Sequence, residues 1–539
     1  MFSQITRAAR SKASMKYVGT KSLAMRLQTS SRAMSVLALP PTPKEHAKPG
    51  FEPYFVGTYI NNQVLKSDSK QWIDVKDPAT DVVIAKVPES TNEELDAAIQ
   101  SAADAFETFK KVPLIKRNEI VFKYIELLKA NKDRLAAIIV SEQGKSWSAA
   151  VADVYRGIQC AEHATQVTKE TETVGMELST DVETLTVREP IGVVSSIQPF
   201  NFPVMIPLWT IPYIIATGNT TVMKPSEQCP STGAILADLA REAGVPAGVI
   251  NIVHGTHNTV NTLISDPRVR AVTFVGGNNA GKYVYDVATK HRKRVQINLG
   301  AKNHTIIMPD ADKASVLKAV VSGGFSSTGQ VCLSTDILLL VGEAKKFIPD
   351  IIETVKGLQA KPGFEDGTFG PVVHKASKER LEAVIADAEA KGAKVHVDGR
   401  VHNKPTDPLY KDGYFIGPTF VEGVKPGMRC VDEELFGPMI TSMEIGSLDE
   451  AIDYVNKNEF GNSVALFTKS GAAANYFQRN VNIGQVGVNT IVPIGHANHG
   501  FTSNKASFLG DLHFYGPSAF KLLTEPKTII TSWRGIDYN

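Results

Sequence analysis

Short runs of β-branched and apolar residues recur along the chain from position 192 and predict buried strands. The five runs lie at residues 192–197, 220–224, 249–253, 271–275 and 294–298. Helix-forming stretches separate them, and the stretch from Ala234 ends on Gly244, the usual stop signal of a helix. Alternating strands and helices form a parallel sheet with right-handed crossovers. The pattern therefore predicts an α/β lobe.

Helical periodicity extends the prediction on both sides of this lobe. Thr91-Asn-Glu-Glu94 is a capping box, and apolar residues at helical spacing follow it, so residues 91–140 are expected to be helical. A second α/β lobe is expected to start at Pro309. Its predicted helices lie near 310–325, 343–360 and 376–392, and its strands near 335–341 and 393–398.

Two segments look like strands without an adjoining helix. Apolar and polar residues alternate from Thr184 to Arg188, within 171–191, and from Thr528 to Thr531, within the tail 516–534. Exposed strands of this kind tend to pair, which indicates an oligomerisation flap and a homodimer or homotetramer.

Composition narrows the class of protein without identifying it. With 539 residues, 43% of them apolar and 21% charged, the chain can form two large lobes or three domains. A formal net charge of +2 and the lack of a dense basic block argue against a nucleic-acid or membrane-surface binder. No run of eighteen apolar residues is present, so no spanning helix is expected.

The first forty-four residues differ from the rest because they are rich in Arg, Lys and Ser, and no acid precedes Glu45. This composition predicts a mitochondrial presequence, residues 1–35, matured near Arg32 to Ser35; a solvated N-terminus is the alternative. The four cysteines share no metal-like spacing, so no metal site is predicted, and they suit the reducing mitochondrial matrix.

Cys332, in Phe325-Ser-Ser-Thr-Gly-Gln-Val-Cys332, and Asn298 form the most informative pair. A thiolate can attack a carbonyl carbon and hold the product as a thioester. An amide side chain cannot take a proton from the water that would release that product. The pair therefore predicts that the acyl group leaves by another route.

Two loops after predicted strands can bind a dinucleotide. The turn Phe274-Val-Gly-Gly277 leads into a helix, where backbone N–H groups can meet a pyrophosphate, although such glycines are also ordinary turn residues. In Lys224-Pro-Ser-Glu227, a cation and a carboxylate can hold a ribose diol, and the carboxylate would repel a 2′-phosphate. A solvated loop explains these two charges equally well.

Two further loops carry candidate polar groups. Pro199-Phe-Asn-Phe-Pro203 pins Asn201 between prolines, and a fixed amide donor beside a thiol can form an oxyanion hole. Glu433-Glu-Leu-Phe-Gly-Pro438 can place Glu434 and Phe436 against a nicotinamide ribose. Read alone, the first is a rigid turn and the second a polar loop.

Taken in order, Pro-Phe-Asn-Phe-Pro, Lys-Pro-Ser-Glu, Phe-Val-Gly-Gly, Gly-Gln-x-Cys and Glu-Leu-Phe-Gly-Pro resemble the aldehyde dehydrogenase superfamily over essentially the whole mature chain. The forms Asn298-Leu-Gly-Ala-Lys-Asn-His304, Cys332-Leu-Ser-Thr335 and Ser507-Phe-Leu-Gly-Asp-Leu512 look like its CoA-acylating branch, methylmalonate or malonate semialdehyde dehydrogenase. In the wider superfamily, a glutamate at the place of Asn298 activates the hydrolytic water.

The resemblance implies an aldehyde dehydrogenase-like α/β fold with a Rossmann-type NAD-binding lobe, an α/β catalytic lobe and a small β oligomerisation flap. It implies an NAD-binding domain at 50–170 and 190–305, a catalytic domain at 306–510 and oligomerisation segments at 171–189 and 515–539. By the same resemblance Cys332 is the nucleophile, and the Asn201 amide and the Cys332 N–H hold the oxyanion. The implied NAD contacts are Phe200, Lys224, Glu227, Gly277, Leu299, Glu434 and Phe436. Gly277 replaces a serine usual in the branch.

The substrate is less well defined than the reaction. The branch offers two arginines for a substrate carboxylate; one matches Arg156, but the other position is Val331, which cannot pair a carboxylate. His496 and His499 lie where the branch has a substrate-tunnel loop, and one of them is a candidate replacement for the missing cation, although exposed loop histidines are the default.

The favoured hypothesis is a mitochondrial NAD-dependent dehydrogenase that transfers the shortened acyl group of a small-molecule semialdehyde to CoA. Malonate semialdehyde, giving acetyl-CoA, stands slightly ahead of the methylated substrate, giving propionyl-CoA, because of Val331. A hydrolysing aldehyde dehydrogenase acting on an uncharged aldehyde is the alternative, favoured by Val331 and opposed by Asn298. A non-catalytic binding protein of the same fold is a third reading, which Cys332 in its full motif opposes.

Overall fold

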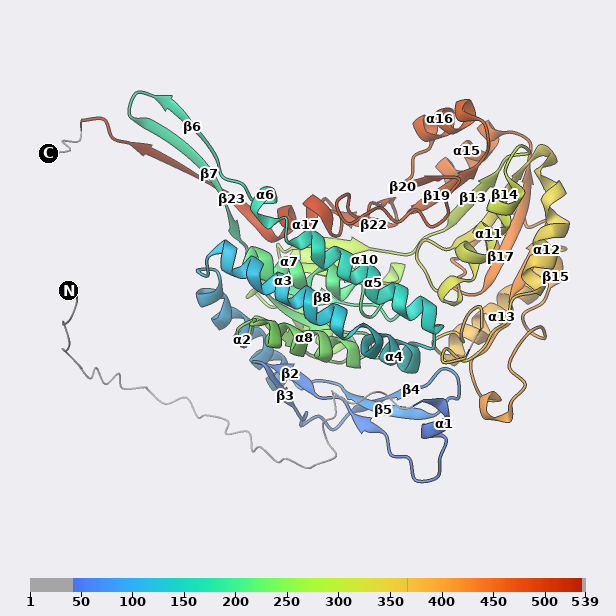
Figure 1. The fold of residues 1–539 in the computed structure, drawn as a ribbon, viewed down its shortest axis with the longest axis horizontal. Coiled ribbons are helices and arrows are strands. Elements are labelled where there is room, and N and C mark those ends of the chain that lie inside the picture. The colour runs from blue at the N-terminus through green and yellow to red at the C-terminus, as the bar shows by residue number, and fades with distance from the viewer. Residues whose placement is uncertain (1–41, 366, 536–539) are drawn as a thin grey trace, which may run out of the picture.

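The computed structural model describes residues 42–365 and 367–535 (Figure 1). The predicted presequence, 1–35, and the last part of the predicted oligomerisation tail, 536–539, lie outside the described residues.

The first lobe is built on an eight-stranded sheet in the order β22-β12-β11-β8-β9-β10-β2-β3. The five predicted runs are confirmed as parallel strands: β8 (Val193–Ile197), β9 (Thr220–Lys224), β10 (Ile250–Ile252), β11 (Val269–Val275) and β12 (Arg294–Asn298). The chain moves from β8 outward to β10 and then returns to the other side of β8 with β11. Ligands of open α/β sheets bind at such a reversal, outside the carboxyl ends of the strands.

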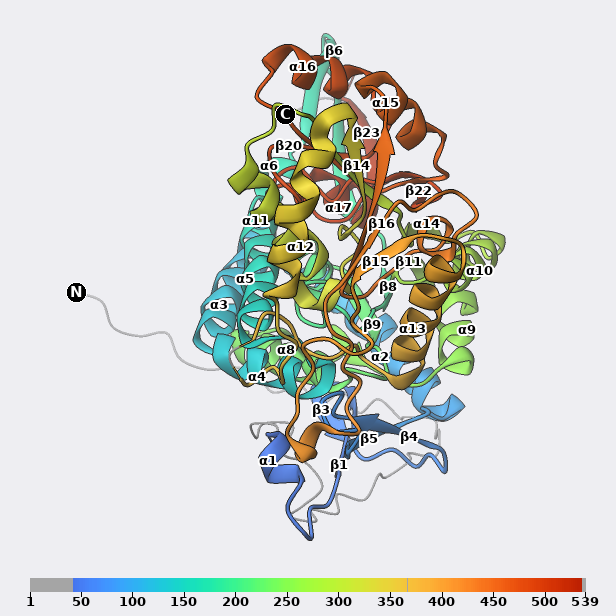
Figure 2. The same cartoon turned by 90° about the vertical axis from the view of Figure 1, so that its right-hand side faces the viewer.

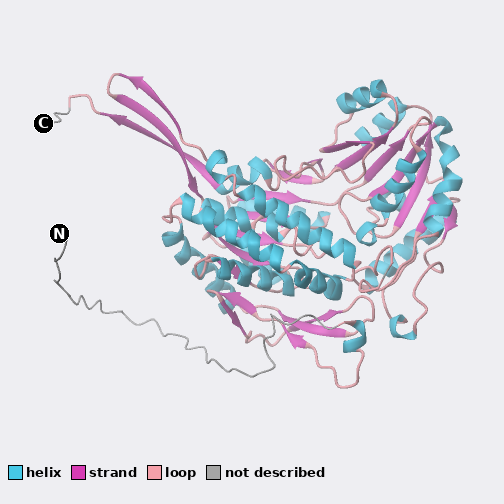
Figure 3. Cartoon of the chain, viewed as in Figure 1, coloured by secondary structure: helices cyan, strands magenta, loops and turns pink. Residues whose placement is uncertain are grey.

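Helices cover both faces of this sheet (Figure 3). Because side chains alternate along a strand, Val193 packs with one set of helices and Val194 with the other. The first set is α2 (Asn92–Phe109), α9 (His257–Ser265) and α10 (Asn278–Lys290). The second set is α3 (Leu114–Ala130), α4 (Lys132–Gln143), α5 (Trp147–Ala164), α7 (Ile211–Thr217) and α8 (Ser231–Ala243). The helices predicted over 91–140 and at 234–244 are thereby confirmed, and Gly244 ends α8 with φ +108°.

The edges of the first sheet contain strands that the periodicity did not predict. At one edge lie β2 (Thr58–Ile60) and β3 (Gln63–Leu65), and at the other β22 (Phe508–Gly510), all antiparallel to their neighbours. A small separate sheet contains β1 (Tyr54–Phe55), β4 (Trp72–Lys76) and β5 (Val83–Pro88). These strands are short or far from their partners in sequence, so local alternation carries little information about them.

The second lobe contains a seven-stranded sheet in the order β15-β16-β17-β14-β13-β19-β20. This lobe faces the viewer in Figure 2. Its strands are β13 (Asn303–Ile307), β14 (Thr335–Val341), β15 (Lys394–Val397), β16 (Thr419–Glu422), β17 (Met439–Ile445), β19 (Ser463–Phe467) and β20 (Gln485–Val488). Its main helices are α11 (Lys313–Gly324), α12 (Ile348–Lys356), α13 (Lys375–Ala390), α15 (Leu448–Lys457) and α16 (Gly471–Asn480). The predicted strands near 335–341 and 393–398 and the three predicted helices are confirmed. The middle helix is shorter than expected because a 3₁₀ segment, Gly342–Phe347, precedes it.

A three-stranded antiparallel sheet, in the order β23-β7-β6, projects from the first lobe (Figure 1). It consists of β6 (Val174–Ser179), β7 (Val182–Pro190) and β23 (Thr524–Ser532), so both predicted strand segments are present. The expectation that no helix adjoins the tail strand is wrong, because Gly516–Leu523 forms α17 and leads directly into β23. This helix buries Phe520 and Leu523 in the core of the first lobe, which favours a helix over an exposed strand.

Short elements complete the described chain: α1 (Pro43–His46), α6 (Val167–Glu170), α14 (Arg429–Asp432), and the strand pair β18 (Phe460–Gly461) and β21 (Asn504–Lys505). Within residues 42–365 and 367–535, no helix combines the length and the apolar character needed to cross a membrane.

Candidate active site

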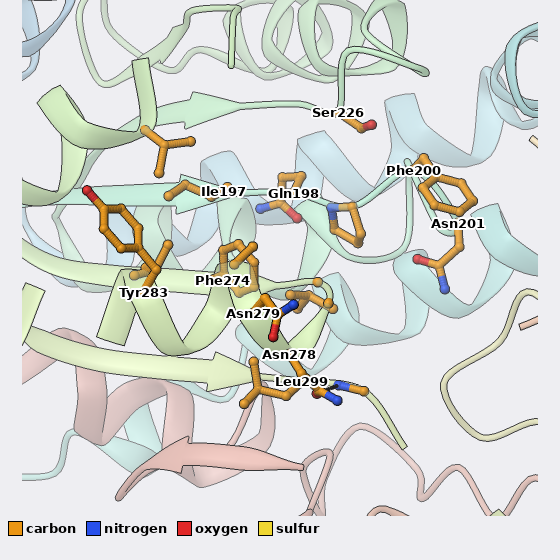
Figure 4. Close-up of a pocket in the computed structure, with 18 of the residues that line it drawn as sticks. Ile197, Gln198, Phe200, Asn201, Ser226, Phe274, Asn278, Asn279, Tyr283 and Leu299 are labelled. Atoms are coloured by element: carbon orange, nitrogen blue, oxygen red, sulfur yellow. Dashed lines mark hydrogen bonds between the residues drawn. The ribbon is translucent and has the colours of Figure 1, made fainter. Parts of the chain in front are cut away.

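A cavity of about 1340 Å³ opens where the strand order of the first sheet reverses. The loops after β8, β9, β11 and β12 line it, and residues of the second lobe, among them Glu434 and Phe436, line its other side. Figure 4 shows Phe200 and Asn201 at one end and Tyr283 at the other. The cavity lining includes nine residues that the sequence analysis selected: Phe200, Asn201, Lys224, Glu227, Gly277, Leu299, Cys332, Glu434 and Phe436.

Lys224 and Glu227 form an ion pair in the loop after β9, with 3.0 Å between Nζ and the carboxylate. Burial raises the pKa of Glu227, but the Lys224 charge, the hydrogen bonds to the carboxylate and His374 together outweigh it, so the pKa is lowered. Glu227 is therefore a carboxylate at neutral pH. A charged carboxylate on this wall can accept hydrogen bonds from a ribose diol.

Gly277 is the N-cap residue of α10, with φ −70° and ψ 155°. A side-chain Cβ at this position would meet nothing within 4 Å, so the backbone faces open space in the cavity. The first N–H groups of a helix have no partner within the helix, and together with the helix dipole they favour a negatively charged ligand. This end of the cavity can therefore hold a diphosphate.

Phe436 and Glu434 approach from the second lobe. The rings of Phe436 and Phe200 meet edge to face, with centroids 5.9 Å apart, and Phe436 has a φ of +48°. Glu434 accepts a hydrogen bond of 3.1 Å from the N–H of Ala301. Burial, helped by the negative charge of Asp336, raises the pKa of Glu434 to about 8. Phe436 and Glu434 therefore line the cavity near the cysteine, one with an aromatic ring and the other with a carboxyl group.

The carbonyl oxygen of Cys332 is tied down by two buried amides. Asn303 donates to it at 2.8 Å and Asn462 at 2.7 Å.

Burial and the Glu434 charge raise the pKa of the Cys332 thiol to about 12, while hydrogen bonds from Asn462 and from the N–H groups of Cys332 and Leu333 oppose that rise. The cysteine is therefore held as a thiol, and the opposing N–H donors are the groups that stabilise a thiolate when it forms.

The Asn201 side chain lies beside the residues that precede the cysteine, since its Nδ2 donates to the carbonyl of Gln330 at 3.0 Å. The side-chain nitrogen of Asn201 carries two N–H groups, so the one that does not bind Gln330 can donate to an oxyanion. The Asn201 backbone is held as well: its carbonyl accepts from Lys145 Nζ at 2.6 Å.

Lys145 itself is fully buried and was not recognised in the sequence. Its Nζ pairs with the buried Asp153 carboxylate at 3.1 Å and lies 4.2 Å from the centroid of the Phe202 ring. Asp153 also accepts from the N–H of Met205 at 2.7 Å. The sequence contains Gly144-Lys145 after an apolar helix and an acidic residue on the next helix. Solvent-exposed charges show the same pattern, so it does not reveal a buried ion pair.

Asn298 is 1% exposed and belongs to a neutral network. The Ser503 hydroxyl lies 3.0 Å from the side-chain oxygen of Asn298 and 2.5 Å from that of Asn462. A hydroxyl has a single proton, so Ser503 donates to one of these oxygens at a time. Asn462 in turn donates to the Cys332 carbonyl. None of these three side chains takes a proton from water at neutral pH, so the network that contains Asn298 supplies no general base.

The residues predicted to recognise the substrate are not gathered in the same way. Arg156 is exposed on α5, where it donates to Gln159 at 3.0 Å, and it does not line the cavity. Val331 is buried in an apolar cluster with Phe202 and Trp209. Both loop histidines, His496 and His499, are exposed, as the default reading expected.

Comparison with known proteins places this geometry in a family. Residues 64–529 match the aldehyde dehydrogenase family. The chain is 43% identical over 497 residues to methylmalonate-semialdehyde dehydrogenase [acylating], mitochondrial, from Arabidopsis thaliana, a match covering 92% of this chain and 81% of the relative. It is 41% identical over 484 residues to methylmalonate-semialdehyde/malonate-semialdehyde dehydrogenase [acylating], mitochondrial, from Homo sapiens, covering 89% and 90%.

Solved structures agree with this assignment. The crystal structure of methylmalonate-semialdehyde dehydrogenase from Oceanimonas doudoroffii superimposes with a TM-score of 0.87 at 35% identity, over 89% of this chain and 99% of that one. A structure from Sinorhizobium meliloti, complexed with NAD, has a TM-score of 0.87 at 34% identity, over 90% and 99%. With its cysteine, its cavity at the strand reversal and this coverage, the chain belongs to the aldehyde dehydrogenase family.

Proposed function

We propose that this protein is an NAD-dependent, CoA-acylating dehydrogenase of malonate or methylmalonate semialdehyde. The relatives from Arabidopsis thaliana and Homo sapiens bear this activity in their names. The observation that carries the proposal is the neutral network of Asn298, Ser503 and Asn462 beside Cys332. Because this network offers no base at the position of Asn298 to activate water, a thioester on Cys332 is expected to persist until a thiol takes the acyl group.

The cavity suits NAD. Glu227 can bind the ribose hydroxyls and repels a 2′-phosphate, and the start of α10 at Gly277 offers N–H groups to the diphosphate. Phe200, Leu299, Glu434 and Phe436 are the proposed contacts nearer the cysteine. When bound, NAD supplies the acceptor for the hydride.

We propose that the Cys332 thiol gives its proton to water in the cavity and attacks the aldehyde carbon as a thiolate. Asn201 and the Cys332 N–H are proposed to donate to the developing oxyanion. Loss of hydride leaves a thioester that carries a carboxylate two carbons away. The bond to that carboxylate breaks, its electron pair enters the thioester carbonyl, and protonation of the α-carbon gives an acetyl or propionyl thioester. The CoA sulfur then attacks, and Cys332 leaves as a thiolate.

The replacement Asn298→Glu tests the central step. Steady-state NADH production from malonate semialdehyde is expected to require CoA and to release carbon dioxide in the unchanged enzyme. Asn298→Glu places a carboxylate beside the thioester and is expected to produce free acid without CoA, while Asn298→Gln, which stays neutral, is not. Rapid turnover of the unchanged enzyme without any thiol acceptor would refute the proposal.

A second candidate is a hydrolysing enzyme for uncharged aldehydes, favoured by the apolar surroundings of Val331. It predicts that the product is a free acid and that CoA has no effect on the rate. The same assay separates the two candidates, and comparison of malonate with methylmalonate semialdehyde decides between the two acyl products.

We propose a mitochondrial matrix location, since the relatives named above are called mitochondrial and the first residues have presequence composition. The domain division stays as inferred from the sequence: NAD binding by 50–170 and 190–305, and catalysis by 306–510.

We further propose that the projecting sheet, 171–189 with the tail from 515, pairs with a second copy of the chain. Val174 and Ile530 are 69% and 66% exposed, and Met176 lies in register with Thr184 and Ile530 on one face. Light scattering is expected to give a dimer or tetramer, and Val174→Glu with Ile530→Glu is expected to give smaller particles. A monomeric unchanged protein would contradict this assignment.

A further inference from the structure

Four aromatic side chains pack together in the apolar cluster that contains Val331. Trp209 is at their centre, with ring centroids 5.1 Å from Phe501, 5.3 Å from Phe514 and 5.2 Å from Tyr515. The same cluster includes Phe202, and the side chain of Cys332 packs against it. These aromatic residues are not part of the lining of the dinucleotide cavity. They therefore form a second, aromatic environment around the cysteine segment.

Two polar atoms in this aromatic environment have no hydrogen-bond partner. They are the hydroxyl of Tyr515, a residue 2% exposed, and the indole nitrogen of Trp209, a residue 3% exposed. Other buried tyrosines in the first lobe are paired: Tyr124 donates to the carbonyl of Leu236 at 3.1 Å, and Tyr213 lies 2.9 Å from His163 Nδ1. A buried polar group without a partner is costly, and these two belong to rings whose centroids are 5.2 Å apart, so one ligand or water can serve both.

The backbone of Tyr515 is strained, with φ 41° and ψ −167°. The residues on either side hold it there. The carbonyl of Phe514 accepts from the N–H of Phe501 at 2.9 Å, and the N–H of Gly516 donates to Tyr213. Strain of this kind persists where the surrounding structure enforces it, and it is commonly found at binding sites.

The chemistry of the two groups identifies the complementary ligand. Burial raises the pKa of the Tyr515 phenol, the thiols of Cys160 and Cys332 raise it further, and Arg156 lowers it. The hydroxyl is therefore protonated at neutral pH and lies within electrostatic reach of both Cys332 and Arg156. An indole N–H donates and never accepts. The phenol can donate as well as accept, and the indole only donates, so a ligand with acceptor oxygens can take up both the Tyr515 proton and the Trp209 N–H.

We propose that Tyr515, together with Trp209, binds the carboxylate of the semialdehyde and so takes the place of the cation that is missing at Val331. This inference rests on the proposed function and deepens it. A carboxylate offers two acceptor oxygens, one for each donor. Arg156, exposed on α5, contributes long-range attraction rather than contact.

Neutral donors also suit the loss of carbon dioxide. The carboxylate becomes a neutral molecule when the bond to the α-carbon breaks, so a strong ion pair would stabilise the starting state more than the transition state. Hydrogen bonds from a phenol and an indole hold the carboxylate in position with a smaller charge interaction.

The test compares Tyr515→Phe with the unchanged enzyme on two aldehydes in the presence of CoA. For malonate semialdehyde, kcat/KM is expected to fall about tenfold to a hundredfold, the range for a hydrogen bond to a charged group. For propanal, which lacks the carboxylate, it is expected to stay within about twofold. The matched control is Tyr124→Phe, which removes a buried hydroxyl that is already paired and should leave the ratio between the aldehydes unchanged.

Inhibition by 3-hydroxypropionate gives an independent measurement, because binding of this carboxylate needs no chemical step. Its inhibition constant is expected to rise about tenfold or more in Tyr515→Phe and in Trp209→Phe. An equal loss on both aldehydes, or no change on either, would overturn the assignment of Tyr515. If NADH production without CoA continues beyond the first turnover in the unchanged enzyme, the acyl-transfer proposal fails, and the ratio between the two aldehydes still tests the carboxylate site.

Discussion

Replacing Lys145 by Met removes the buried charge that holds the loop of Asn201. Lys145 and Asp153 both have 0% side-chain exposure, and Lys145 Nζ contacts the Asp153 carboxylate at 3.1 Å and the Asn201 carbonyl at 2.6 Å. Met has a similar length and can retain the packing on the Phe202 ring. The change therefore deletes the charge and its hydrogen bonds with little change in volume.

The expected loss of stability is about 3 to 5 kcal/mol, the cost of leaving one member of a buried ion pair without its partner. The unpaired Asn201 carbonyl adds up to about 1 to 3 kcal/mol, which overlaps with the first contribution because both come from one ammonium group. Typical folds have about 5 to 15 kcal/mol of stability, so this variant stays folded at room temperature if the unchanged protein lies in the upper part of that range. The double variant Lys145→Met with Asp153→Asn is expected to be more stable than Lys145→Met alone, because it leaves no unpaired charge.

The pH dependence of unfolding follows from Asp153. Burial raises the pKa of Asp153 in the folded protein, and Lys145 opposes that rise. Without Lys145 the folded-state pKa is higher still, so the folded state keeps the proton more firmly than the unfolded state. The penalty is therefore absent below the unfolded pKa of about 4 and grows as the pH rises through the folded pKa.

Urea unfolding between pH 4 and 8, with single-turnover NADH formation, measures both effects. Loss of position at Asn201 is expected to lower kcat, with about a hundredfold to a thousandfold as the limit set by losing one oxyanion donor. Lys293→Met is the matched control, because Lys293 is buried and donates to the carbonyls of Asp266 and Val269 away from the cysteine. Stability independent of pH in Lys145→Met, or equal losses of kcat in Lys145→Met and Lys293→Met, would refute the reasoning.

Two other changes have clear expected outcomes. In Gly277→Ser the added Cβ has no atom within 4 Å, and serine suits an N-cap position. The melting temperature is therefore expected to stay unchanged or rise slightly, and KM for NAD to fall severalfold. A raised KM for NAD would contradict the diphosphate site. Alkylation of Cys332 by iodoacetamide is expected to be slow at pH 7.5 and to accelerate about tenfold per pH unit, because the thiol has a pKa of about 12. Cys332→Ala is the control for reaction at other groups. A rate that reaches a plateau below pH 9 would contradict the raised pKa.

The carboxyl-edge motifs could be predicted because each is local. Lys224 and Glu227 follow directly after one buried strand, and Phe200 and Asn201 follow another, so strand patterning alone brings these loops to the same edge of a parallel sheet. The helix α17 was missed because Phe520 and Leu523 indicate burial only once the lobe against which they pack is known.

Lys145, Ser503 and Tyr515 could not be recognised in this way. Lys145 meets Asn201 across 56 positions and Ser503 meets Asn298 across 205, and a polar residue in sequence carries no sign of whether water or protein surrounds it. The value of a charge or a hydrogen bond depends on that surrounding.

The sequence by itself determined the α/β pattern, the thiol of Cys332 and the neutral side chain of Asn298, because residue identity settles what a group can donate, accept or attack. Only the tertiary structure decided which polar groups are buried away from water, which of these are hydrogen-bonded, and which, like the Tyr515 hydroxyl, have no hydrogen-bond partner. The reason is that burial and pairing arise from segments distant in the chain, and these two quantities set the energies of polar groups.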